Sequence, residues 1–285
     1  LDPGVDTGTY WRDLDVRGKP FLVERVGVGE FKHRLSLWTA RQTMALARSI
    51  SVRSSESAAH PLLQGLDVGV GRDPAFDYLA TRQALDRLDE RDRSSVGALL
   101  ADSEGALRIG INLRPVSNDW HPRGAQHAAR TVDRFMVALA DGMARFAAQA
   151  KREVRFVFFP MNSIQFGMSD LTAAYRLHAL LGSRARLLVW EADPGVDGVL
   201  QLLRRLDAAV VMRLHAAIFS FSQDVPVLGI DYFADRNSKL TQLFRDEQRD
   251  QDVCGMEAFT ADWLQERLAL ALRQADNRSV GRAAM

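Results

Sequence analysis

The chain holds few of the residues from which disulfide or metal frameworks are built. Cys254 is the single cysteine, which excludes an internal disulfide framework and is too little for a zinc cluster. The six histidines show no metal-ligand spacing such as His-Glu-x-x-His. We therefore expect no metal, and the low cysteine content is compatible with a reducing compartment.

Long apolar runs are also missing. No run approaches the roughly 20 apolar residues that cross a bilayer, and residues 1–6 are acidic and turn-rich, unlike a signal peptide. Because the chain does not begin with Met, we expect a truncated or processed product. We expect it in the cytoplasm, with at most peripheral contact at the inner membrane face. A helix near 35–48 carries Arg41 and Arg48 for such contact, although a solvated helix face is the simpler explanation.

Neither positive nor negative charge is in excess in this chain. The 37 basic and 36 acidic residues give a net charge of +1, so no global field would attract nucleic acid. The chain also lacks a Gly-x-Ser-x-Gly elbow, a Walker-type phosphate loop and a carboxylate pair at suggestive spacing. The usual hydrolase and nucleoside triphosphatase functions therefore have no support, and we expect no nucleic-acid partner.

What the chain does contain is a regular alternation of strands and helices. Its 285 residues, 47% of them hydrophobic, suffice for about two domains with their own cores. Strands followed by helices of ten or more residues are typical of βαβ units and parallel sheets. We expect an α/β fold of two Rossmann-like domains facing a cleft, as in two-domain transferases. The predicted domains are 1–104, which includes a linker and is one or two βα units short at its start, and 105–285.

The predicted elements follow from the hydrophobic pattern. The expected strands lie at about 21–26, 50–53, 107–113, 154–159, 185–190, 208–212 and 225–230, and residues 69–74 form a strand end and turn. The expected helices lie at about 35–48, 55–64, 125–150, 171–181, 198–206 and 261–275, and another begins after residue 213. The charged stretch 79–105 is predicted as surface helix and linker.

The tripeptide Arg213-Leu214-His215 stands where the buried strand 208–212 ends and a helix begins. Ligands bind at this edge of open α/β sheets, and the N–H groups of a helix start favour anions. The chain repeats the tripeptide at 176–178, but there it lies within a helix that Ser169 and Asp170 begin. Arg213 and His215 are therefore candidate site residues because of their position at a strand end, and not because of the tripeptide itself.

Arg114 also follows a strand, before Pro115, at the same edge of the sheet. Two guanidinium groups at one edge suit a small dianion or trianion, because arginine recognises carboxylate and phosphate in bidentate geometry. His215 can act as an acid or a base near neutral pH. A surface ion pair for Arg114, and a helix cap or core contact for His215, are the structural alternatives.

Three further residues are candidates for the site. Trp120 lies among hydrogen-bonding side chains in the loop after Arg114, which suits a carbohydrate platform, and packing beneath the loop explains it equally well. Tyr232 and Lys239 follow the last strand and can line the cleft, although each has an adequate structural explanation. The Gly27-Val28-Gly29 turn lacks the third glycine of a dinucleotide fingerprint, so a tight turn explains it.

These segments together resemble the polysaccharide pyruvyl transferase family. The similarity rests on residues 213–220, on the Val-Pro-Val-Leu-Gly-Ile-Asp-Tyr run at 225–232 with the later Lys239, and on Asn112-Leu113-Arg114-Pro115. Weaker matches follow the family order at Gly27-Val28-Gly29, 50–53, Glu56-Ser57 and 73–76. A Gly-Asp-Glu-like motif expected before Leu1 is missing, and the spacing from Tyr232 to Lys239 is longer than usual.

The resemblance implies a GT-B-like fold and transfer of the enolpyruvyl unit of phosphoenolpyruvate to a sugar of a cell-surface polysaccharide or exopolysaccharide. His215 is then the catalytic acid, Arg114 and Arg213 bind the donor, and Asn112, Leu214, Tyr232, Lys239 and Trp120 complete the substrate site. It implies no cofactor, and the partner is a saccharide acceptor that is either free or lipid-linked. Two alternatives stay open: a GT-B glycosyltransferase that uses a nucleotide sugar, with an acidic contact such as Glu191, and a non-catalytic relative that binds anions or glycans.

Overall fold

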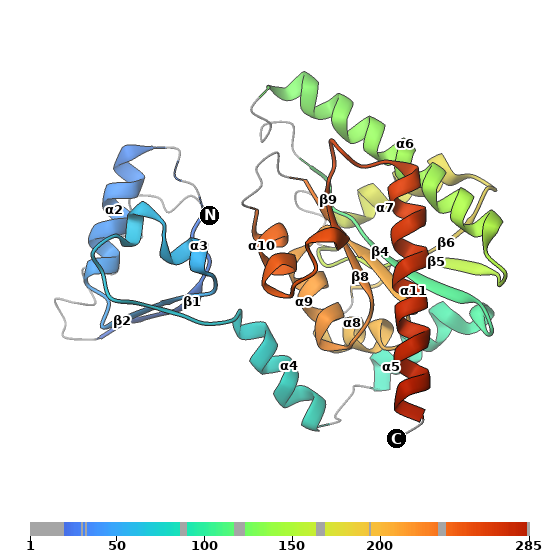
Figure 1. Cartoon of the computed structure of the whole chain (residues 1–285), viewed down its shortest axis with the longest axis horizontal. Helices are drawn as coiled ribbons and strands as arrows, with labels where there is room; N and C mark the ends of the chain where they lie inside the picture. Colours follow the sequence, from blue (N-terminus) through green and yellow to red (C-terminus); the bar gives the residue numbers. More distant parts are fainter. Residues whose placement is uncertain are drawn as a thin grey trace. The chain divides into compact units, whose positions relative to one another are not determined.

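The computed structural model of the chain describes residues 20–29, 31, 33–85, 90–116, 123–163, 169–193, 195–232 and 238–283. The chain divides into two compact units, Leu1–Tyr78 and Leu79–Met285. Each unit is built on a parallel sheet (Figure 1). The predicted α/β class is therefore confirmed.

The larger unit contains a parallel sheet with the order β6-β5-β4-β7-β8-β9. Its strands are β4 (Leu107–Asn112), β5 (Val154–Phe158), β6 (Arg186–Val189), β7 (Ala208–Val211), β8 (Val227–Asp231) and β9 (Val253–Gly255). The chain starts in the middle of the sheet, proceeds to one edge, and returns to the middle at β7. The neighbours β4 and β7 therefore form the point where the strand order reverses, which is where α/β sheets bind ligands.

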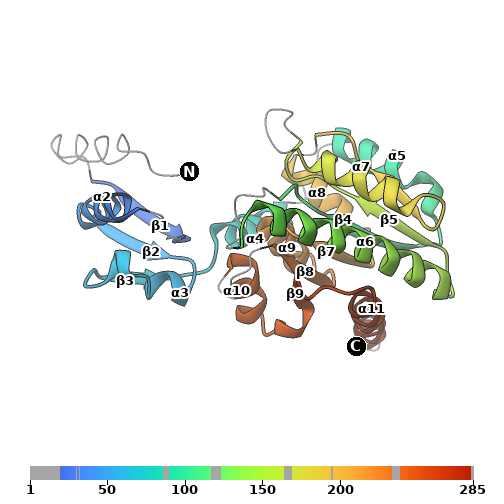
Figure 2. The same cartoon turned by 90° about the horizontal axis from the view of Figure 1, so that it is seen from above.

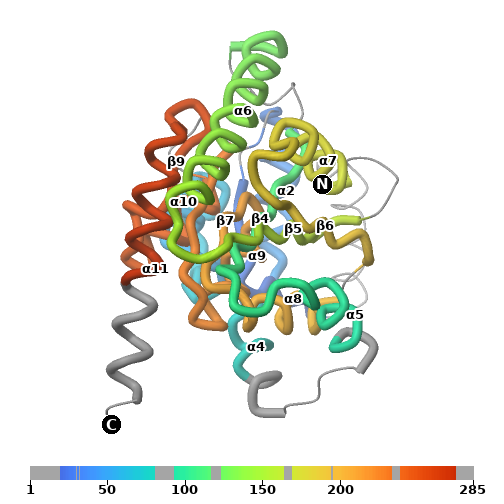
Figure 3. The backbone as a smooth tube through the Cα atoms, turned by 90° about the vertical axis from the view of Figure 1, so that its right-hand side faces the viewer, coloured from blue at the N-terminus to red at the C-terminus, as the bar shows by residue number. Residues whose placement is uncertain are grey.

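Helices cover both faces of this sheet. On one face, Ile109 and Ile111 of β4 pack in a core with residues of α6 (Ala125–Gln149), α7 (Asp170–Leu181) and α11 (Ala261–Ala283). Figure 2 shows α7 beside α6, and Figures 1 and 3 show α11 along the same unit. The other face is covered by α5 (Glu90–Leu100), α8 (Val196–Leu203), α9 (Leu214–Ser222) and α10 (Lys239–Asp246).

Burial on both faces explains why the strands of this sheet are mostly apolar. Every residue of β5, β7 and β8 is buried, as the apolar runs predicted for a parallel sheet. The predicted strands at 107–113, 154–159, 185–190 and 208–212 are confirmed to within a residue or two at their ends.

The smaller unit contains a parallel sheet in the order β1-β2-β3, made of β1 (Leu22–Val26), β2 (Ser49–Val52) and β3 (Val68–Val70). The helix α2 (Arg34–Ala45), the short α3 (Ser55–Ala58) and the 3-10 turn Pro61–Leu63 connect these strands. Ile50, Val52, Leu62 and Leu63 form its core, and residues of α2 pack against them.

The turn after β1 is explained by packing. The guanidinium group of Arg53 lies against Gly27, so a Cβ added at Gly27 would stand 2.5 Å from Arg53 Nε. Arg53 also forms an ion pair of 2.6 Å with Asp73. This pair links the segment after β2 to the segment after β3. Gly27 is therefore needed for the close approach of an arginine, which agrees with the interpretation of this segment as a tight turn.

The stretch 79–105, predicted as surface helix and linker, is largely helical. It contains the end of α4 (Pro74–Leu85) and the whole of α5, and α5 packs against α8 of the larger unit. Trp190 Nε1 donates a hydrogen bond of 3.0 Å to Ser95 Oγ, which ties α5 to the end of β6. In the sequence, the division between the two units falls after Tyr78, within α4.

Candidate functional site

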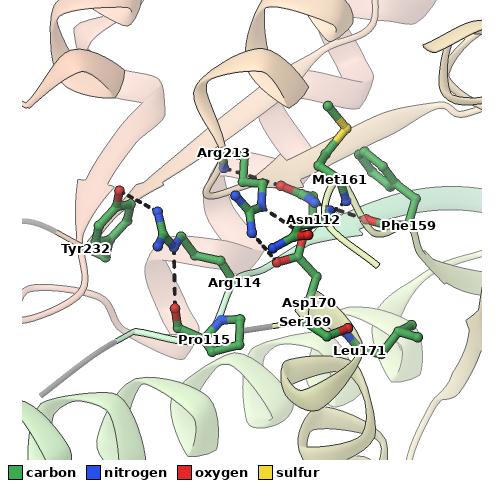
Figure 4. Close-up of polar contacts among 11 residues, drawn as sticks. Asn112, Arg114, Pro115, Phe159, Met161, Ser169, Asp170, Leu171, Arg213 and Tyr232 are labelled. Atoms are coloured by element: carbon green, nitrogen blue, oxygen red, sulfur yellow. Dashed lines mark hydrogen bonds and ion pairs between the residues drawn. The ribbon is translucent and has the colours of Figure 1, made fainter. Parts of the chain in front are cut away.

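The residues predicted from the strand ends gather at the reversal point of the larger sheet (Figure 4). Asn112 ends β4 and Arg114 follows it, while Arg213 lies between β7 and α9. The pairing of Asn112 with Val211 places these two strand ends side by side. The carboxyl edge of the sheet thus brings together the two arginines that the sequence analysis selected.

Asn112 joins three strand ends. Its side chain is fully buried, Nδ2 donates to the backbone oxygen of Phe159 at 3.0 Å, and Oδ1 accepts from the backbone N–H of Arg213 at 3.3 Å. The amide therefore fixes the loops after β4, β5 and β7. Its predicted contact with substrate stays a prediction.

Arg213 is held by a carboxylate that the sequence analysis assigned only to a helix start. Its Nε donates to Asp170 Oδ2 at 2.8 Å and its Nη2 to Asp170 Oδ1 at 2.5 Å. The Asp170 side chain is fully buried, whereas 21% of the Arg213 side chain is exposed. The guanidinium is thus fixed along one edge and reaches solvent along another.

Arg114 is oriented by Tyr232, which follows β8. Arg114 Nη1 donates to the Tyr232 hydroxyl at 2.9 Å, and the guanidinium carbon lies 4.8 Å from the centre of the ring. Burial raises the pKa of Tyr232, Asp231 raises it too, and the charges of Arg114 and Arg213 act in the opposite direction. Both guanidinium groups act on one hydroxyl, so the two arginines and Tyr232 lie close to one another.

Leu214 and His215 form the first turn of α9, directly after Arg213. Leu214 is half-buried and His215 is exposed, and the His215 ring lies 6.3 Å from the ring of Phe219. The imidazole therefore stands at the helix start beside the fixed arginine, open to solvent. This position is the predicted one.

Lys239 is the exposed first residue of α10, and its place depends on a buried carboxylate. Asp231, at the end of β8, accepts hydrogen bonds from Ser238 and, at 2.5 Å, from Thr241 Oγ1. Ser238 caps α10 by accepting from the Thr241 N–H. Asp231 thus fixes the start of the helix that carries Lys239.

The first Arg-Leu-His copy behaves as predicted. It lies within α7, where Leu177 is buried, His178 is exposed and Arg176 pairs with Asp133 of α6. No member of this copy stands at a strand end. Trp120 lies outside the described residues, as does the loop around it.

Asp170 is the main residue that sequence reasoning missed. Ser169 and Asp170 were recognised only as the start of a helix, and the cap itself is confirmed, since Ser169 Oγ accepts from the Leu171 N–H. Nothing in the sequence relates Asp170 to Arg213, because the two stand 43 positions apart and meet only through the sheet order.

Fold and site together define an α/β protein of Rossmann-like parallel sheets, with an arginine-rich site at the reversal point of the larger sheet. The family model of polysaccharide pyruvyl transferases matches residues 13–233, and the chain belongs to this family. The predicted resemblance is confirmed. The comparison with curated protein sequences finds no match.

Solved structures of similar fold agree with this class. The chain is similar to a protein from Listeria monocytogenes described as a candidate UDP-N-acetylglucosamine 2-epimerase, with a TM-score of 0.59 and 13% identity over 93% of this chain and 63% of that one. It is also similar to an apo structure of OtsA, with a TM-score of 0.51 and 12% identity over 93% and 66% of the two chains. This chain thus spans less than two thirds of their lengths. The likeness shows the fold alone, and it confirms the GT-B-like class.

No helix in the described part of the chain has both the length and the hydropathy to cross a membrane. Within the same residues, no three His, Cys, Asp or Glu side chains form a group that could hold a metal ion.

Proposed function

We propose that this chain transfers the enolpyruvyl unit of phosphoenolpyruvate to a saccharide and forms a pyruvyl ketal. The observation that carries the proposal is that Arg114 and Arg213 lie together at the reversal point of the larger sheet (Figure 4), with His215 in the first turn of the helix that follows Arg213. Phosphoenolpyruvate has a carboxylate and a phosphate on one carbon. Two guanidinium groups at one edge match that pair of oxyanions.

Each residue has a distinct part in this proposal. Arg213 and Arg114 hold the two oxyanion groups, and Tyr232 orients Arg114 through its hydroxyl. Asn112 keeps the strand ends in register, while Leu214 and Lys239 stand at the helix starts that flank the site. Fixed donors of this kind stabilise charge that develops during reaction without having to reorganise.

The chemistry balances with the residues present. His215, as imidazolium, gives a proton to the methylene carbon, and the carbon that bears the phosphate becomes electrophilic. One sugar hydroxyl attacks that carbon and returns its proton to His215. The bond from carbon to the phosphate oxygen then breaks, a second hydroxyl closes the ketal, and its proton leaves with inorganic phosphate. No metal or cofactor enters this scheme.

The acceptor is a saccharide of a cell-surface polysaccharide or exopolysaccharide, either free or lipid-linked. A cytoplasmic location with peripheral membrane contact is part of the proposal. The surface that suits such contact lies on α2, where Leu35 is 63% exposed and Trp38 56% exposed. Arg34 is exposed in the first turn of the same helix, and tryptophan and arginine together suit a lipid interface. Arg48 is exposed beyond the other end of α2, and Arg41 instead donates to the backbone oxygens of Pro61 and Gln64.

Calorimetric titration of the chain with phosphoenolpyruvate tests the donor site. We expect binding in the micromolar to millimolar range, which Arg213→Ala should weaken by about 100-fold. Arg176→Ala, in the other copy of the tripeptide, should leave it unchanged. Incubation with donor and polysaccharide should then release inorganic phosphate and leave acid-labile pyruvate on the glycan. A folded chain that binds a nucleotide sugar and not phosphoenolpyruvate would instead be a glycosyltransferase.

A further inference from the structure

Asp170 carries a buried carboxylate that accepts four hydrogen bonds. Its carboxylate accepts from the backbone N–H groups of Met161 and Asn162, at 3.0 and 3.1 Å, and from Nε and Nη2 of Arg213. A buried carboxylate is tolerated only when it is paired and hydrogen-bonded. These four donors, from two segments, therefore fix its position closely.

The consequence for Arg213 follows from the shape of a guanidinium group. Arginine has five N–H donors, which form a side edge of Nε and one Nη, and an end edge of both Nη atoms. Asp170 occupies the side edge. Among the described residues no partner bonds Nη1 or the second N–H of Nη2, so the end edge keeps two parallel donors for an oxyanion.

We infer that Asp170 is a positioning residue of the donor site, which holds Arg213 so that its end edge faces the oxyanion of the donor. The inference rests on the proposed function. A long arginine side chain loses rotamer freedom when it binds a ligand, and a bidentate carboxylate removes that loss before the ligand arrives. Asp170 therefore raises the affinity for the donor without touching it.

The cap of α7 does not explain why a carboxylate stands at this position. Ser169 already supplies the cap, because its hydroxyl accepts from the Leu171 N–H. An amide at position 170 would keep the size of the side chain but lose one acceptor opposite Arg213. The chain therefore offers a matched pair of variants: Asp170→Asn changes the hold on Arg213, and Ser169→Ala changes the helix start alone.

A double-mutant cycle with phosphoenolpyruvate as probe tests the inference. We expect Asp170→Asn to weaken binding by about 10- to 100-fold, the range of a hydrogen bond to a charged group. In an Arg213→Ala background, Asp170→Asn should cause less than a twofold further change, because the residue through which it acts is gone. Ser169→Ala should lower the melting temperature and leave the affinity within twofold.

Equal losses from Asp170→Asn in both backgrounds would overturn the inference, and so would an affinity loss from Ser169→Ala as large as that from Asp170→Asn. A chain that fails to bind phosphoenolpyruvate would overturn the proposed function, and the cycle is then run with inorganic phosphate.

The hold on Arg213 has a readout that needs no ligand. The NMR signal of the Arg213 Nε–H, assigned by its loss in Arg213→Lys, should be protected from solvent exchange in the unmodified chain and unprotected in Asp170→Asn. Exchange as fast as that of exposed arginines in the unmodified chain would overturn the positioning role, whichever anion binds.

Discussion

The side-chain oxygen of Asn112 and the backbone N–H of Arg213 form a hydrogen bond of 3.3 Å across the point where the strand order reverses. The other end of the same amide donates to the backbone oxygen of Phe159. One buried side chain thus sets the relative position of three loops. The placement of Arg213 therefore depends on it.

Replacement of Asn112 by alanine should destabilise the larger unit. Two buried backbone groups, the oxygen of Phe159 and the N–H of Arg213, lose their partner, and each unsatisfied group costs about 1–3 kcal/mol. We expect the free energy of unfolding, measured in urea, to fall by roughly 2 kcal/mol or more. Asn112→Asp should destabilise more at neutral pH than in acid, because a carboxylate would face the Phe159 oxygen until it is protonated. Unfolding curves that match those of the unmodified chain would contradict this role.

The titration of Tyr232 should report the charge of Arg114. Burial raises the pKa of the hydroxyl above its ordinary value of about 10, and Arg114 opposes that rise. Arg114→Ala should therefore raise the pKa of Tyr232 further. The raised pKa also means that the folded state holds this proton longer than the unfolded state, so stability is lost as pH rises past about 10. Ultraviolet difference titration against Tyr232→Phe measures the pKa, and urea unfolding at several pH values measures the stability. A lower pKa in Arg114→Ala would contradict the contact.

Much of the larger unit could be predicted because its strands are buried on both faces. Runs such as 154–159 and 208–212 are mostly apolar, so they show neither the alternation of a half-buried strand nor the periodicity of an amphipathic helix. The same unit contains long helices such as α6. The missed elements are short and depend on tertiary contacts. Helix α10 spans Lys239–Asp246, and β9 spans Val253–Gly255, so neither gives a long periodic signal.

The residues of the candidate site also differ in whether the sequence alone could predict them. Arg114, Arg213 and His215 could be predicted from their places at strand ends, which chain order alone specifies. Asp170 could not, because its meeting with Arg213 depends on which strands become neighbours. Asn112 was selected through the family resemblance, but its burial and its two backbone partners are visible only in the folded chain.

Gly229 of β8 gives a stability test of the unpredicted helix α10. A Cβ added there would stand 2.7 Å from Cε2 of Phe244 and 3.0 Å from Cγ2 of Val253. Gly229→Ala should therefore overpack this interface and lower the free energy of unfolding by about 1–3 kcal/mol. The control is Gly255→Ala, whose Cβ would meet nothing within 4 Å and should cost less than about 0.5 kcal/mol. Equal losses of unfolding free energy in the two variants, measured in urea, would show that α10 does not pack against Gly229.

His215 should separate catalysis from binding. Glutamine keeps a polar side chain at the helix start but cannot donate a proton to carbon, so His215→Gln should slow phosphate release in single-turnover transfer by about 10²–10⁴-fold. The affinity for phosphoenolpyruvate should change by less than about threefold, because the arginines hold the oxyanions. His178→Gln in the other Arg-Leu-His copy is the matched control and should alter neither quantity, since that histidine is exposed within α7. If His215→Gln instead weakens donor binding as much as Arg213→Ala does, the imidazole is a third oxyanion contact and the proton comes from another group.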